Sequence, residues 1–302
     1  MVTTTSGSHP KFLWPGIHAT FGKAYAEKPV YAEMVFDEQT SDKSYEEYVE
    51  DTGYGLAPIK PEGTSVSYDT DKQGYTSRLT NVTYGLGSII TKEAIDDNQY
   101  ENVAMSKASK LARSMRQTKE NVFANILNRA FTAGFTGGDG SILCVSSHPT
   151  VDGTQSNVQT VAADLSEAAL EDLLITVRLA KDSRGLRIQL KGMKLVIPPQ
   201  LEFIATRILS SQNQSGTANN DINAIRQTGM LPGGLVVWDY LTDTDAWFIK
   251  TDAPTGMIRQ TRTKMSFTQD NDFDTTNARM KSIERYSAGW GDWRSLYASP
   301  GA

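Results

Sequence analysis

The longest regular pattern of apolar and polar positions in this chain lies between Asn98 and Phe135. Two series of positions spaced seven residues apart interleave there and form one narrow stripe at helical spacing. These positions are Ala104, Leu111 and Thr118, with Ala108, Met115, Val122 and Arg129. The segment contains no proline, and its first glycine is Gly134. We therefore predict one helix over residues 98–135, about 50 Å long at a rise of ~1.5 Å per residue.

The other face of this predicted helix is basic. It carries Lys107, Lys110, Arg113, Arg116 and Lys119. Such a face is compatible with exposure to solvent, with contact to nucleic acid, or with pairing to acidic residues of another subunit. Lys110 and Arg113 are our candidates for contacts between subunits on this face.

A different pattern precedes the helix, with alternating residues typical of a β-hairpin. Val66 and Tyr68 alternate with polar residues, and residues 69–74 supply the turn. The return strand is predicted over residues 75–90. Its apolar positions change parity after residue 79, which predicts a bulge or bend in that strand.

This hairpin is too polar to bury a core of its own. Between residues 60 and 78 the sizeable apolar side chains are few, so we expect the ribbon to complete itself on another molecule. The candidate contacts on the ribbon are Val66, Tyr68, Lys72, Tyr75 and Arg78.

After the long helix, elements of both types follow one another. A helix is predicted from Asp164, with Asp164 or Ser166 as its cap and Gly185 at its end. Further predicted elements are a strand at 193–197, a helix opened by Pro198–Pro199, strands at 235–238 and 246–249, and a strand at 278–286. Near the amino end, a short helix is predicted at 17–25. Interleaved helices and strands over 164–250 indicate a compact α/β unit.

Composition places the chain among ordinary globular proteins. Its 302 residues are 39% hydrophobic and 22% charged, with a net charge of −5. That negative balance argues against a protein that grips nucleic acid over a broad basic surface. No apolar run reaches the ~18 residues of a membrane helix. Cys144 is the single cysteine, so a disulfide within the chain is excluded.

No constellation of catalytic residues is evident, and we predict no catalytic, cofactor-binding or metal-binding residues. Cys144 and His148 are four residues apart, but a structural cysteine near a turn histidine explains them better than a nucleophile and its base. Asp239, Asp243 and Asp245 form a loose acidic group between two strands, which is typical of turn formation as well as of a cation site.

The order of parts resembles the major capsid proteins of tailed bacteriophages, which have the HK97-like fold. An amino-terminal arm, a protruding hairpin, one long helix, an inserted α/β unit and long return strands follow one another as in that family. The strings similar to the Mu-like major head subunits and their relatives are Gly140–Leu143, Ser147–Pro149, Asp152–Gly153, Ser156–Asn157 with Asp164–Ser166, and Lys194–Pro199 with Leu201–Glu202. Gly289–Arg294 also resembles a pattern common among such proteins.

This resemblance implies an α+β fold and five parts. They are an N-terminal arm (1–51), an extended β-hairpin or E-loop (52–90), a peripheral domain with the spine helix (91–163), an axial domain (164–254), and return strands that complete the peripheral domain (255–302). It also implies self-assembly into hexamers and pentamers, an icosahedral shell around double-stranded DNA, and a place in the virion after assembly in the bacterial cytoplasm.

The resemblance further implies partners. These are other copies of the chain, a portal, a possible decoration protein and weakly bound packaged DNA. About 50 residues precede the hairpin, so a separate scaffolding protein or a processed precursor is expected. Lys72 lies where crosslinking members of the family carry their lysine, but its context favours a solvated turn residue. The alternatives are an encapsulin-type nanocompartment shell protein and a soluble α/β enzyme with a site near residues 239–245.

Overall fold

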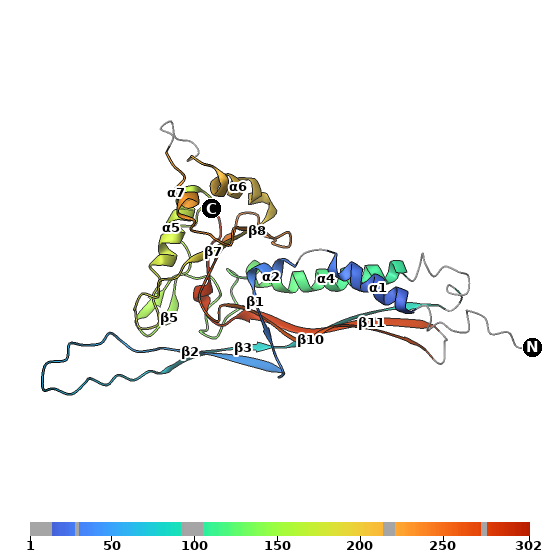
Figure 1. The fold of residues 1–302 in the computed structure, drawn as a ribbon, viewed down its shortest axis with the longest axis horizontal. Coiled ribbons are helices and arrows are strands. Elements are labelled where there is room, and N and C mark those ends of the chain that lie inside the picture. The colour runs from blue at the N-terminus through green and yellow to red at the C-terminus, as the bar shows by residue number, and fades with distance from the viewer. Residues whose placement is uncertain (1–13, 28–29, 92, 94–104, 214–220, 273–276) are drawn as a thin grey trace, which may run out of the picture.

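The computed structural model of the chain describes residues 14–27, 30–91, 93, 105–213, 221–272 and 277–302. The first part of the predicted long helix, residues 98–104, lies outside the described residues. Among the described helices, none is long and apolar enough to cross a membrane. Figure 1 shows a long arm, an α/β unit above one end of it, and a loop that projects beyond that end.

The arm is built on a four-stranded sheet with the order β1-β10-β11-β4. Its strands are β1 (Asp37–Thr40), β4 (Val82–Ile90), β10 (Met257–Asn271) and β11 (Ala278–Trp290). β11 pairs antiparallel with both β10 and β4, and β1 pairs parallel with β10. The strand predicted at 278–286 is confirmed and extends four residues further.

Helices cover one face of this sheet (Figure 1). They are α1 (Trp14–Ala26), α2 (Tyr31–Val35) and the long α4 (Met105–Asn128). The helix predicted at 17–25 is confirmed by α1. The first half of the predicted stripe is confirmed, because Ala108, Leu111 and Met115 of α4 are buried. Phe123 and Leu127 continue the buried side, whereas Thr118 and Val122 are half-buried and Arg129, beyond the helix, is exposed.

The prediction that this helix continues to Phe135 was wrong. Beyond Asn128 the chain tightens, and the amide of Ala130 bonds to the carbonyl of Leu127 at 3.0 Å. The carbonyl of Ala130 then accepts from the amide of Cys144 at 3.0 Å instead of from a later turn of helix. A turn that contains Gly134, at φ +94°, follows.

The α/β unit has its own sheet, with the order β12-β9-β7-β8. Its strands are β7 (Gly192–Ile197), β8 (Leu235–Val237), β9 (Trp247–Thr251) and β12 (Leu296–Ser299). Its helices are α5 (Glu167–Arg178), η4 (Pro199–Leu201), α6 (Glu202–Ser210) and α7 (Ala224–Thr228). The predicted strands at 193–197, 235–238 and 246–249 and the helix after Pro198–Pro199 are confirmed, whereas α7 was not predicted.

Two details of this unit differ from the predictions. Ser166 is the N-cap of α5 and accepts from the amide of Ala169, but the helix ends at Arg178 and not at Gly185. Gly185, at φ +84°, belongs to a later turn closed on Asp182. The strand β12 pairs with β9, so the end of the predicted 255–302 part completes the sheet of the 164–254 part.

One core joins the arm to the α/β unit. It contains Phe123 and Leu127 of α4, Trp238 and Phe248 of the α/β unit, and Tyr286 of β11. A second cluster lies between α5, α6 and the sheet of the unit, and a third lies between α1, the first half of α4 and the far end of the arm. Because the first cluster is shared, the two parts are packed together without a solvent layer.

The protruding hairpin is also positioned differently from the prediction. Its strands are β2 (Tyr45–Asp51) and β3 (Gln73–Thr80), which pair antiparallel. Residues 64–68 form no strand, and Gln73 and Gly74 belong to β3 and not to a turn. The predicted irregularity after residue 79 is confirmed, because Asn81 separates β3 from β4 and the two strands belong to different sheets. The small hairpin of β5 (His148–Thr150) and β6 (Gly153–Gln155) and the turn η5 (Trp293–Ser295) complete the described elements.

Candidate assembly interface

The β2–β3 hairpin carries a 21-residue loop, residues 52–72, that leaves the body of the molecule (Figure 1). The loop is closed at its root between Thr52 and Lys72. The amide of Thr52 donates to the carbonyl of Lys72 at 3.1 Å, and the amide of Lys72 donates to the Thr52 hydroxyl at 2.9 Å. These bonds bring the two ends of the loop together, so its middle must extend away from the strands.

A second closure lies one step further out. Asp69 Oδ2 accepts from the amide of Gly55 at 2.8 Å and from Nη1 of Arg184 at 2.8 Å. Arg184 also donates to the carbonyl of Thr70. The amide donors of Gly55 and Thr70, together with Arg184, hold the pKa of the Asp69 carboxyl below its usual range. Arg184 belongs to the α/β unit, so this contact sets the direction of the loop relative to that unit.

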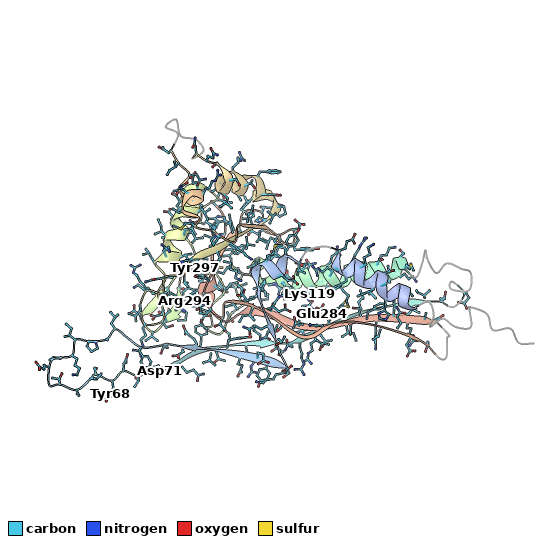
Figure 2. All side chains as sticks on the ribbon, viewed as in Figure 1. Tyr68, Asp71, Lys119, Glu284, Arg294 and Tyr297 are labelled. Carbon is cyan, nitrogen blue, oxygen red and sulfur yellow. The ribbon has the colours of Figure 1, made fainter. Side chains whose placement is uncertain are left out.

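Beyond these closures the apolar side chains of the loop face solvent. Leu56 is 82% exposed, Ile59 and Tyr68 are each 93% exposed, and Val66 is 60% exposed. Figure 2 shows Tyr68 on one limb of the projecting loop, further from the body than Asp71. Several large apolar side chains in one exposed segment indicate a contact surface for another molecule.

A buried ionic group fixes the hairpin to the body. Arg294, 3% exposed in its side chain, contacts Glu50 of β2 at 3.3 Å and Asp292 at 3.2 Å, and donates to the carbonyl of Lys181 at 2.8 Å. Burial acts to lower the pKa of Arg294, but the carboxylates of Asp292 and Glu50 outweigh it and raise that pKa. Ser183 donates to Glu50 as well. The group thus joins the hairpin, the α/β unit and the carboxyl-terminal segment.

The motif residues that are far apart in sequence meet in the core. His148, fully buried, bonds through Nδ1 to Asp139 at 2.6 Å, and its ring stacks on that of Trp293 with centroids 4.1 Å apart. The Asn157 side chain accepts from the amide of Val145 at 2.9 Å and donates to the carbonyl of Leu143 at 2.7 Å. These contacts give the Ser147–Pro149, Ser156–Asn157 and Gly289–Arg294 strings a structural role in closing the core.

The residues considered above as possible catalytic or metal-binding groups make structural contacts instead. Cys144 is buried, which raises the pKa of its thiol. His148 bonds through its two ring nitrogens to Asp139 and Asn157 and not to Cys144. Asp243 accepts from the amides of Asp245 and Ala246, as a turn former does. Asp239 accepts from the Tyr31 hydroxyl at 3.0 Å. Across the described residues, no group of three or more His, Cys, Asp or Glu side chains could hold a metal ion.

The structure separates the candidate residues of the ribbon into two groups. Val66, Tyr68 and Lys72 are exposed on the loop, where a neighbour could reach them. Tyr75 is half-buried, and burial followed by the carboxylate of Asp292 raises the pKa of its hydroxyl. Arg78 contacts Glu47 of β2 at 2.7 Å. Arg78 therefore has a partner within the hairpin while its side chain stays 57% exposed, and Tyr75 is only partly accessible.

The basic face of the long helix is likewise divided. Lys110 is exposed, and Arg113 contacts Glu27 at 3.2 Å with both side chains largely exposed. Lys119 is buried and bonds to Glu284, so its assignment to the exposed face was wrong. Lys119 lies four residues after Met115, and this spacing places both on the core side of the helix.

Sequence reasoning missed the outgoing strand of the hairpin and the residues that fasten it. β2 has the sequence Tyr-Glu-Glu-Tyr-Val-Glu-Asp, which is rich in charge and has exposed or half-buried residues throughout. Its β-branched and aromatic positions were the available signal. Arg184 and Glu50 could not be found, because their partners lie more than 100 residues away.

Solved structures with the same fold include a virus-like particle, a phage procapsid and the capsid of a GTA particle. The chain is similar to the virus-like particle of Pyrococcus furiosus, with 10% identity, a TM-score of 0.57 and coverage of 94% of this chain and 98% of that one. It is similar to the procapsid protein of bacteriophage JBD30, with 17% identity, a TM-score of 0.53 and coverage of 98% and 76%. The capsid of the native GTA particle matches with 12% identity, a TM-score of 0.58 and coverage of 91% of each chain. At such identities the likeness shows the fold alone.

Among curated proteins, none matches this sequence. The family comparison is more informative, because residues 74–299 match the family described as phage capsid protein. That range begins in β3 and ends in β12, so it includes the whole sheet of the α/β unit, three of the four strands of the arm sheet, the long helix and the buried motif residues. The chain belongs to the phage capsid protein family and is a structural major capsid protein with the HK97-like fold.

Proposed function

We propose that this chain assembles into hexamers and pentamers that close an icosahedral shell around double-stranded DNA. The observation that carries the proposal is the 52–72 loop, whose apolar side chains have no core in their own chain. Each such side chain gains ~1.5–3 kcal/mol when it is buried, so contacts repeated around a shell supply a large free energy. The loop of each copy reaches over the adjacent subunit.

We assign a role in the shell to each of the predicted parts of the chain, with two changes of boundary. The α/β unit, residues 164–254 with β12, surrounds the axis of each capsomer, and the arm forms the shell layer. The hairpin begins at Tyr45 instead of residue 52. The role is structural and non-enzymatic, as the family implies. The proposed partners are separate scaffolding and portal proteins, a possible decoration protein and weakly bound DNA. Assembly takes place in the host cytoplasm before the virion is complete.

Shortening the loop tests this proposal. Residues 56–68 are replaced by a short glycine–serine linker, which keeps Gly55, Asp69 and the Thr52–Lys72 closure. Since the removed residues are exposed, we expect the unassembled subunit to keep its helical signal and to melt within a few degrees of the wild type. We expect negative-stain microscopy to show few or no closed particles.

Point variants refine the test. Ile59→Ser in the loop should raise the protein concentration needed for assembly. Val161→Ser is the matched control, because Val161 is 75% exposed on the body of the molecule. Normal closed particles from the shortened chain would refute the role of the loop. If the wild-type chain stays monomeric under all assembly conditions, the shell proposal itself is refuted.

A further inference from the structure

A pocket of about 410 Å³ opens where the helices of the arm meet the α/β unit. The end of α1, the start of α2 and the middle of α4 line it from the arm, and the turn after β8 lines it from the α/β unit. Figure 1 shows α2 beside α4 at the end of the arm that meets this unit. We call it the junction pocket, and its lining includes Ala24, Tyr31, Arg116, Glu120, Asp239 and Tyr240.

Glu120 lines this pocket with a carboxylate that accepts no hydrogen bond. The residue is 2% exposed, and neither of its side-chain oxygens has a hydrogen-bond donor among the described residues. Nε of Arg116 lies 3.8 Å from Oε1, which is too long for a hydrogen bond. The amides of Tyr31 and Ala32 and the indole of Trp238 approach the carboxylate outside hydrogen-bond geometry. A buried acceptor without a donor is costly, so a donor that enters the pocket would stabilise the protein.

The groups around Glu120 share a negative electrostatic field. Burial raises the pKa of Glu120, and Arg116 offsets only part of this shift. Burial also raises the pKa of the Tyr31 and Tyr240 hydroxyls, and the carboxylates of Asp239 and Glu120 raise both further. A positive group in the pocket would therefore be attracted by two carboxylates at once.

The formal charge of the lining is one cation short of neutral. Glu27, Glu120 and Asp239 supply three negative charges, whereas Arg113 and Arg116 supply two positive charges. Arg113 contacts Glu27 at 3.2 Å, and both of these side chains are largely exposed. This outer pair neutralises itself and leaves Arg116 to face two carboxylates. A ligand with one positive charge inside the pocket would complete the balance.

The lining favours an organic cation over a metal ion. Among the described residues, no three His, Cys, Asp or Glu side chains are grouped closely enough to hold a metal. Ala24 and the rings of Tyr31 and Tyr240 offer apolar contact, and aromatic rings also attract cations. An ammonium group has three donors for the two oxygens of Glu120. The pocket volume is many times the ~30 Å³ of one water molecule, so a chain of several carbon atoms fits beside the charge.

We propose that the junction pocket binds an alkylammonium group, with its charge on the Glu120 carboxylate and its aliphatic chain against the tyrosine rings. A free polyamine and a lysine side chain of another protein chain both present this chemistry. The bound group would contact the helices of the arm and the turn of the α/β unit together. The inference goes beyond the proposed function and does not depend on it, because the whole pocket lies within one chain.

Titration of the unassembled subunit with putrescine tests the proposal. Calorimetry at about pH 8, where the amines are protonated, measures the binding of putrescine and butylamine. Butanol, which has the same chain length and no charge, is the control ligand. Glu120→Gln keeps the shape of the side chain and removes its charge, and Ala24→Leu fills part of the pocket. Glu202→Gln is the matched control variant, because it removes one carboxylate at an exposed position of α6.

We expect one putrescine to bind to each wild-type subunit and to raise its Tm, since the ligand binds the folded chain. Glu120→Gln should weaken this binding at least about tenfold, because a charge-assisted hydrogen bond is lost. Ala24→Leu should weaken it as well, and Glu202→Gln should bind as the wild type does. Circular dichroism checks that each variant folds. If Glu120→Gln fails to fold, Ala24→Leu together with the butanol control still decides the result.

Closed particles distinguish the two sources of the ammonium group. Particles that bind added putrescine as the subunit does, or that release a polyamine on unfolding, indicate a free amine. Particles that exclude putrescine, although the subunit binds it, indicate a lysine side chain of another chain.

Two results would overturn the inference. The wild-type subunit could bind putrescine no better than butanol, which would leave water as the occupant of the pocket. Putrescine could also bind equally to the wild type, Glu120→Gln and Ala24→Leu, which would place it elsewhere on the surface. Failure of the wild-type chain to assemble would refute the proposed function and leave the binding result unchanged.

Discussion

The ion pair between Lys119 and Glu284 joins the long helix to the sheet beneath it, and its removal should be costly. The side chains are 11% and 2% exposed, and Figure 2 labels them next to each other between the long helix and the arm sheet. Glu284 also accepts from the Tyr25 hydroxyl at 3.1 Å, and the Lys119 amine lies 5.3 Å from the centre of the Tyr286 ring. The pair thus connects α1, α4 and β11.

Lys119→Met should lower the free energy of unfolding by about 3–5 kcal/mol, because it leaves the Glu284 carboxylate buried without its cation. For a chain of this size, a loss of that order lowers Tm by roughly 6–20 °C. The double variant Lys119→Met/Glu284→Leu should recover most of the loss, since replacing both partners removes the buried charge together with its counterion.

Chemical denaturation of the unassembled subunits measures these differences directly. Arg113→Met is the matched control, because its pair with Glu27 is largely exposed and should contribute less than about 1 kcal/mol. The reasoning fails if the free energy of unfolding of Lys119→Met lies within about 1 kcal/mol of the wild-type value. It also fails if the double variant has as low a free energy of unfolding as the single variant.

Two further predictions concern the body and the hairpin. Burial raises the pKa of the Cys144 thiol, so the native protein at pH 8 should react with a thiol reagent only on unfolding. Rapid labelling of the folded protein would contradict the burial of Cys144. Gly138→Ala should destabilise the attachment of the hairpin by about 1–3 kcal/mol, because its Cβ would lie 2.6 Å from the carbonyl oxygen of Thr76 in β3. Limited proteolysis should then cut β3 sooner, whereas Gly22→Ala, where an added Cβ meets no atom within 4 Å, should not change it.

The sequence alone determined the elements whose stabilisation is local. The apolar positions of α4 were predictable because helical spacing records which side of a helix is buried. The Ser166 cap of α5 was predictable from its residue type, and the strands at 193–197 and 246–249 from their short apolar runs. The order of these elements was also sufficient for the resemblance to capsid proteins, which the family match confirmed.

Only the tertiary structure decided how distant segments meet. β12 joins the sheet of the α/β unit, β2 pairs with β3 across a 21-residue loop, and Arg294 contacts Glu50. These contacts depend on register and ionic partners chosen from the whole chain, for which a local pattern carries no information. The same limit applies to Lys119, which resembles a surface lysine in sequence. Its carboxylate partner lies 165 residues away, and only the fold brings the two charges into one buried site.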